Sequence, residues 1–131
     1  LGALAFAWVD DALGPRRTIL IALACLTGLS LALVVVESKA AFWLFGVPLG
    51  AFVGPAQSAS RSLMARLAPA AQRAEMFGLY ALSGKSTAWA GPLAMGGVTA
   101  LFESQRAGMA TILVFFLIGG WLLWRVSDDK R

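Results

Sequence analysis

The chain of 131 residues contains no histidine and a single cysteine, Cys25. Without histidine, it can build neither a histidine-based metal site nor a nucleophilic triad that uses a histidine base. One cysteine excludes an internal disulfide, and the position of Cys25 in an apolar run is typical of a small packing residue. We therefore expect no metal site and no cofactor.

Acidic residues are also scarce, with seven Asp and Glu in all. They lie at the ends of apolar segments or in predicted loops: Asp10, Asp11, Glu37, Glu75, Glu103, Asp128 and Asp129. General acid–base chemistry needs carboxyl groups whose environment tunes them for proton transfer. Because no pair of carboxylates lies inside an apolar segment, the sequence argues against a hydrolase, and we expect a protein that is not an enzyme.

Hydrophobic residues, by contrast, make up 59% of the chain and charged residues only 14%, and the mean hydropathy is +0.75. A helix needs roughly 20 residues to cross the hydrocarbon core of a bilayer. The apolar runs predict an all-α integral membrane protein with long helices at residues 18–36, 40–62, 75–101 and 107–126. Residues 1–9 cover only about half a span and predict the end of a further helix, so we expect a fragment of a longer transmembrane region.

The basic residues predict how the helices are oriented. One set of loops, together with the C-terminal end, carries Arg16, Arg17, Arg61, Arg66, Arg73, Arg125, Lys130 and Arg131. The alternate loops carry only Lys39 and Arg106. Because cytosolic loops are enriched in Lys and Arg, we expect a cytosolic C-terminus. The net charge of +4 follows from this topology and suits contact with the lipid bilayer, so no nucleic-acid partner is expected.

Lys85 is the only charged residue in the apolar run from Met76 to Ala100. An ionisable group at bilayer depth is costly and marks a functional pathway by default. On a helix, its face is shared by small or kinking residues, namely Gly78, Ala81, Ala88, Pro92 and Gly96. Small residues allow another helix to approach closely, so we expect Lys85 to face protein or a cavity. A transport-related contact and a purely structural ion pair are both open at this point.

Other polar residues accompany Lys85 as candidates for a substrate pathway. Ser83, Ser86 and Thr87 supply hydroxyl groups nearby in the sequence, although hydroxyls in membrane helices often bond to their own backbone. On a helix, Ser83 and Thr87 project roughly opposite Lys85, so they rank lower as candidates. Gln57 and Arg61 lie toward the cytosolic end of the predicted helix 40–62. We expect these residues, with Lys85, to include the ones that contact a transported solute.

Glycines and prolines predict close packing and kinks in the same two helices. Gly46, Gly50 and Gly54 repeat at four-residue steps, which favours close contact with another helix. Gly54-Pro55 and Gly91-Pro92 are paired helix breakers, and Pro48 is a further candidate for an interruption. Broken helices recur around the binding sites of transporters.

The first predicted loop resembles the cytoplasmic loop motif of the major facilitator superfamily. A helix containing Gly2-Ala3-Leu4-Ala5 is followed by Asp11, Gly14, Arg16 and Arg17. A carboxylate favours the positive end of a helix, glycine allows a tight turn, and arginines anchor the cytosolic side. The spacing before Asp11 is longer than in the usual motif, and Pro15 occupies a position that is often basic.

Four further stretches, 54–63, 74–88, 91–93 and 104–108, resemble the vacuole effluxer family of that superfamily. Its best-known fungal member exports amino acids from the vacuole. The resemblance implies the end of helix 8 and helices 9 to 12 of a twelve-helix secondary transporter that works by alternating access. It also implies a small-molecule substrate, with amino acids as the leading class, and the remaining N-terminal helices as partners. We expect a multi-pass protein of the bacterial plasma membrane.

Two other functions stay open from the residues alone. One is a small four-helix exporter, which the absence of a membrane-embedded glutamate disfavours. The other is a non-transporting scaffold or assembly subunit, in which Lys85 pairs with a partner helix.

Overall fold

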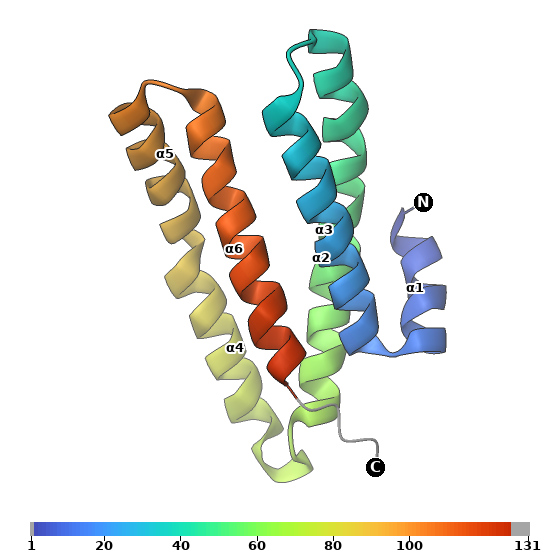
Figure 1. Cartoon of the computed structure of the whole chain (residues 1–131). Coiled ribbons are helices and arrows are strands. Elements are labelled where there is room, and N and C mark those ends of the chain that lie inside the picture. Colours follow the sequence, from blue (N-terminus) through green and yellow to red (C-terminus); the bar gives the residue numbers. More distant parts are fainter. Residues whose placement is uncertain (1, 127–131) are drawn as a thin grey trace.

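The structure, a computed structural model, describes residues 2–126, and every regular element in that range is helical (Figure 1). The elements are α1 (Gly2–Leu13), α2 (Pro15–Val35), α3 (Lys39–Leu67), the short 3-10 helix η1 (Ala70–Gln72), α4 (Arg73–Ala88), α5 (Ala90–Phe102) and α6 (Gln105–Arg125). The fold class expected from the apolar runs, an all-α membrane bundle, is therefore the one observed. Lys130 and Arg131, part of the basic C-terminal end, lie outside the described residues.

The connection between α1 and α2 is much shorter than the loop expected from the sequence. Asp11 belongs to the last turn of α1, and α2 begins at Pro15, so only Gly14 separates the two helices. Proline suits the first position of a helix because its φ is already helical and its missing N–H would have no partner there. Gly14 has a φ of 84°, a conformation that other residues rarely adopt. Arg16 and Arg17 are consequently helical.

Proline has different consequences in the two helices where interruptions were expected. Helix α3 continues through both Pro48 and Pro55. The expected helix 75–101 is instead divided at Trp89, three residues before Pro92, whose ring disfavours a helical carbonyl four residues earlier. Trp89 keeps right-handed helical angles, so α4 and α5 follow each other end to end (Figure 1).

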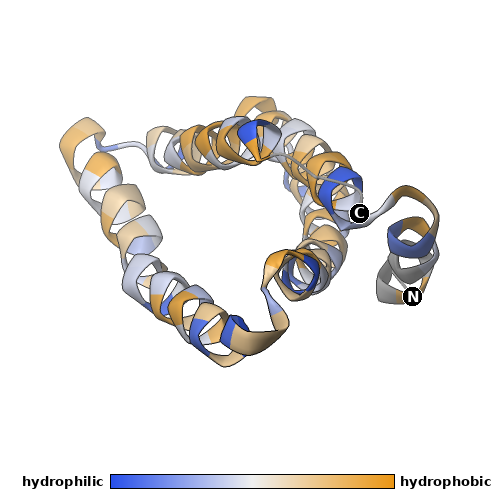
Figure 2. Cartoon of the chain, turned by 90° about the horizontal axis from the view of Figure 1, so that it is seen from below, coloured by the Kyte–Doolittle hydropathy of each residue, from blue (hydrophilic) through white to orange (hydrophobic). Residues whose placement is uncertain are grey.

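Within the described residues, three helices are long and apolar enough to cross a membrane, namely α2, α3 and α6. The fourth expected span is met by α4 and α5 together, because neither helix alone has the required length. Hydrophobic residues occur along every helix (Figure 2), and many large ones are exposed; Trp8 and Leu101, for example, are more than 80% exposed. Such a surface suits lipid and neighbouring membrane helices, and the chain is an integral membrane protein.

Helix α2 is the centre of the packing, since it contacts α1, α3 and α6. A small core forms where Ile19 of α2 meets Ala59 and Leu63 of α3, with Leu23 and Leu123 packed against it. Helix α4, by contrast, contacts only α3, η1 and α5 among the described elements. One face of the α4–α5 helix therefore has no cover from this part of the chain.

Candidate functional site

The α3–α4 hairpin positions the residues expected to form a substrate pathway. Its two helices are joined by a hydrogen bond of 2.6 Å between the hydroxyls of Ser60 and Tyr80. Because Ser60 donates its own proton to the carbonyl of Gln57 at 2.8 Å, the Tyr80 hydroxyl is the donor in the bond between them. The Phe77 ring packs edge-on against Tyr80, with ring centroids 6.4 Å apart. The Ser60–Tyr80 bond sets the register in which α3 and α4 leave the turn.

With this register, three of the residues predicted for the substrate pathway, Gln57, Ser83 and Thr87, lie on the facing sides of α3 and α4. At about 100° per residue, Ser83 lies about 60° and Thr87 about 20° from Tyr80 around α4. Gln57 lies about 60° from Ser60 around α3, one turn farther from the hairpin. Gln57, Ser83 and Thr87 are all exposed, so they border the space between α3 and α4 without closing it.

The hydroxyls of Ser83 and Thr87 are occupied by their own helix. Ser83 donates to the carbonyl of Tyr80 at 3.1 Å, and Thr87 donates to the carbonyl of Ser83 at 2.8 Å. Each oxygen keeps accepting capacity, but its proton is used. These two residues are therefore suited to accept a hydrogen bond from a solute rather than to donate one.

Lys85 points in another direction, about 140° around α4 from Tyr80. It is exposed, and no residue of α4, all of which the structure describes, is buried. Within residues 2–126, the ion pair formed by Glu37 and Arg106 does not involve Lys85, and no acidic side chain pairs with it. The structure thus separates the ammonium group of Lys85 from Ser83, Thr87 and Gln57. Arg61 and Ser86 are also exposed.

The glycine stripe of α3 has room beside it. A Cβ built on Gly46, Gly50 or Gly54 would meet nothing within 4 Å, so no helix in the described range packs closely on these positions. Gly91 of α5 is equally open. The close helix contact lies instead at Gly108 of α6, where a Cβ would collide with Thr99 Oγ1 and lie 2.9 Å from the carbonyl of Met95. Sequence reasoning missed this role for Gly108, although flanking Ala107 and Ala110 are a signal for close packing.

Of the two adjacent aspartates at the end of α1, Asp10 is more shielded from solvent than Asp11, the residue that the resemblance to the loop motif singled out. Asp11 is exposed, whereas the Oδ1 atom of Asp10 is shielded from solvent and has no hydrogen-bond partner in the part of the chain that the structure describes. The Nε atom of Arg16 is also shielded from solvent and has no hydrogen-bond partner among the described residues. The Nη2 atom of Arg16, by contrast, donates to the carbonyl of Trp124. The two aspartates are adjacent in the sequence, and their different phase on α1 gives them different surroundings.

A second arginine joins α2 to α6 at the opposite end of the bundle. Arg106 lies 3.4 Å from Glu37 and also 3.4 Å from the carbonyl of Val36. Arg16 and Arg106 thus attach the antiparallel helices α2 and α6 to each other at both ends. Both members of the Glu37–Arg106 pair are largely exposed, so this pair contributes modestly to stability.

No group of three or more His, Cys, Asp or Glu residues in the described range lies close enough to hold a metal ion. The polar groups described above are hydroxyls, an amide and isolated cations on uncovered helix faces.

Comparison with known proteins gives a consistent family. The family model described as "Vacuole effluxer Atg22 like" matches residues 2–131. Autophagy-related protein 22 of Cryptococcus neoformans var. neoformans serotype D (strain B-3501A) is 30% identical over 94 residues, which are 72% of this chain and 17% of that protein. The uncharacterized MFS-type transporter YxiO of Bacillus subtilis is 29% identical over 93 residues, which are 71% of this chain and 22% of YxiO.

The chain therefore spans about a fifth of the length of these curated relatives. No solved structure matches it. The likeness to an MFS-type transporter and the all-helical arrangement identify the fold as part of a major facilitator helix bundle. With the family model covering residues 2–131, the chain belongs to the vacuole effluxer Atg22-like family.

Proposed function

We propose that the chain is part of a secondary transporter that moves a small solute carrying a carboxylate, with amino acids as the leading class. In this proposal, α1 corresponds to the end of helix 8, α2, α3 and α6 to helices 9, 10 and 12, and α4–α5 to helix 11 of a twelve-helix bundle. The missing helices cover the open faces, and alternating access comes from rocking of the two halves. The printed name of YxiO, an MFS-type transporter, supports this class.

The observation that carries the proposal is the isolation of Lys85. Its ammonium group lies in the α4–α5 helix, on a face that no described element covers, and without a counter-charge in residues 2–126. Leaving a charge unpaired at bilayer depth is costly, so a partner from outside this part of the chain is required. A substrate carboxylate fulfils that requirement when the site is loaded, and water does so when the site is open.

The orientation proposed for the membrane follows from the ends of the helices. Arg16, Arg17 and Arg125 lie at the end where α2 begins and α6 finishes, and Arg66 and Arg73 flank the α3–α4 turn at the same end (Figure 1). Lys39 and Arg106 lie at the other end. The bias favours a cytosolic position for the first end and for the C-terminus. We place the protein in the plasma membrane of a bacterium, in line with the likeness to the Bacillus subtilis protein.

The test is uptake of labelled amino acids by proteoliposomes that contain the full-length transporter. We expect Lys85→Met to lower uptake about ten- to a hundredfold, the size that corresponds to loss of a charge-assisted hydrogen bond. Lys85→Arg keeps the charge and should retain part of the activity. Lys39→Met removes the other lysine in the described range, which lies exposed at the start of α3, and serves as the matched control.

Normal uptake by Lys85→Met at normal expression would refute the role of Lys85. Unchanged uptake combined with loss of assembly would instead favour the scaffold function. Absence of uptake of every amino acid by the wild-type protein would remove the proposed substrate class. In that case a panel of other small carboxylates, measured with the same lysine variants, would test the cationic site independently.

A further inference from the structure

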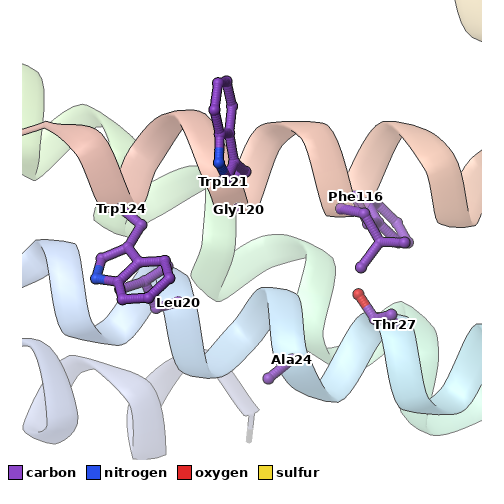
Figure 3. A pocket seen from close by; sticks show the side chains of 8 residues that line it. Leu20, Ala24, Thr27, Phe116, Gly120, Trp121 and Trp124 are labelled. Carbon is purple, nitrogen blue, oxygen red and sulfur yellow. The ribbon is translucent and has the colours of Figure 1, made fainter.

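An apolar groove of about 560 Å³ runs between α2 and α6, away from the α3–α4 hairpin. Figure 3 shows it lined by Leu20, Ala24 and Thr27 from α2 and by Phe116, Trp121 and Trp124 from α6. The Thr27 hydroxyl donates to the carbonyl of Leu23 at 2.7 Å, so its proton is already used. The lining is dominated by methyl groups and aromatic rings, which suits a hydrocarbon chain better than a polar solute.

The groove opens on the side of the α2–α6 pair that is turned away from α3. On the other side, a smaller pocket of about 280 Å³ is lined by Ile19 and Leu23 of α2, Leu63 of α3, Tyr80 of α4 and Leu123 of α6. In Figure 3, the ribbon of α3 accordingly lies behind the two helices that frame the groove. Helices α2 and α6 thus separate an inward pocket from an outward groove.

One end of the groove carries a concentration of positive charge held against its tryptophans. The guanidinium of Arg125 lies 4.1 Å from the centroid of the Trp121 ring. Arg16 donates to the carbonyl of Trp124, and the next residue, Arg17, is exposed. Tryptophan and arginine together are typical of the level of the lipid headgroups.

The distance along α2 from the arginines to the far end of the groove matches one leaflet of a bilayer. Thr27 follows Arg16 by eleven residues, which corresponds to about 16 Å along α2. The hydrocarbon core is about 30 Å thick, so a single leaflet contributes about 15 Å. A chain whose headgroup lies beside the arginines would therefore reach the Thr27 end of the groove at the middle of the membrane.

From these observations we infer that the groove binds an anionic phospholipid of the cytosolic leaflet. One acyl chain lies between α2 and α6 against Leu20, Ala24 and Phe116. The phosphate lies beside Arg17 and Arg125, while Arg16 keeps its bond to Trp124. This site is separate from the transported solute, and the inference does not depend on the substrate or on Lys85.

The test uses fluorescence of the full-length protein in nanodiscs, with lipids brominated high on one acyl chain as quenchers. Brominated phosphatidylglycerol and brominated phosphatidylcholine are each titrated into an unbrominated background. The part of the quenching that disappears in Trp124→Phe reports on the groove. We expect wild-type protein to prefer phosphatidylglycerol by roughly fivefold for each contributing arginine, and the double variant Arg17→Gln/Arg125→Gln to lose that preference.

Arg66→Gln, which removes a basic residue from the end of α3 instead, should leave the preference unchanged. Ala24→Phe fills the groove and should reduce the Trp124-dependent quenching by both lipids. Thermal unfolding of each variant establishes that it is folded, and the arginine double variant suffices if Ala24→Phe unfolds. Equal quenching by the two lipids in the wild-type protein would overturn the choice of an anionic lipid. No Trp124-dependent quenching by either lipid would show that another helix covers the groove, and would overturn the site itself.

Discussion

Gly108 offers the sharpest test of how α5 and α6 pack. A methyl group at this position would collide with Thr99 Oγ1, lie 2.9 Å from the Met95 carbonyl oxygen and lie 3.3 Å from Met95 Cγ. The Thr99 hydroxyl and the Met95 side chain can rotate away, but the carbonyl oxygen belongs to the backbone of α5 and cannot move without shifting that helix. Overpacking of this kind costs typically about 1–3 kcal/mol.

The matched control is Gly119 of the same helix, because a Cβ there would meet nothing within 4 Å. Replacement of glycine by alanine in a helix gains up to about 1 kcal/mol from backbone preference. If this gain is equal at the two sites, Gly108→Ala should be less stable than Gly119→Ala by about 1–3 kcal/mol. Gly119→Ala itself should be neutral or slightly stabilised.

The assay is denaturant-induced unfolding of the full-length protein in detergent micelles, followed by circular dichroism for the wild type and both variants. A third variant, Gly108→Ser, adds more volume than Gly108→Ala, so it should lower the midpoint of unfolding at least as much. Equal stabilities of Gly108→Ala and Gly119→Ala would refute the close contact between α5 and α6 at this point.

Two further comparisons test the end of the bundle where the α3–α4 turn and the start of α2 lie. Tyr80→Phe should lower the free energy of unfolding by about 0.5–1.5 kcal/mol, because it removes the bond to Ser60 but leaves the Ser60 hydroxyl bonded to its own helix. The double variant Tyr80→Phe/Ser60→Ala should be only slightly less stable than Tyr80→Phe. If the losses of the two single variants add up in the same unfolding assay, the pairing is contradicted. Asp10→Asn should raise the thermal midpoint by the equivalent of about 1 kcal/mol, because it removes the charge from a group whose shielded carboxylate oxygen has no hydrogen-bond partner in the described residues. Asp11→Asn, at an exposed position, should leave the midpoint unchanged, and a clear loss of stability in Asp10→Asn would contradict this reasoning.

The sequence was a good guide to the helices and a weaker guide to their ends. Hydrophobic runs of about 20 residues leave a membrane-spanning helix as the natural outcome, because a helix satisfies its own backbone polar groups. The start of α2 at Pro15 could also have been read from the preference of proline for the first helical turn. The sequence did not show that α3 continues through Pro55 while the next helix is divided near Pro92. Both sites have the same Gly-Pro sequence, so no local pattern distinguishes them.

For the candidate site too, the sequence indicated some features and the structure was needed for others. Composition and spacing singled out Lys85, and that choice needed only the rule that a lone charge in an apolar run is costly. Its separation from Ser83 and Thr87 also follows from the sequence, because both project roughly opposite Lys85 on a helix. That Ser83 and Thr87 lie on the side toward α3 is known only from the pairing of Tyr80 with Ser60. That pairing joins residues twenty positions apart and depends on the η1 turn, which no local pattern specified.

The amino-acid sequence by itself determined that this protein is a membrane helix bundle, which end of each helix is rich in basic residues, and which charge is isolated in an apolar helix. These properties are local sums of hydropathy and charge, so no neighbour can change them. Only the tertiary structure decided that Gly108 rather than the stripe at Gly46, Gly50 and Gly54 meets a close neighbour, that Asp10 rather than Asp11 is shielded, and that arginines join α2 to α6 at both ends. Each of these depends on which surfaces of distant helices meet, and helix packing angles and phases set that outcome.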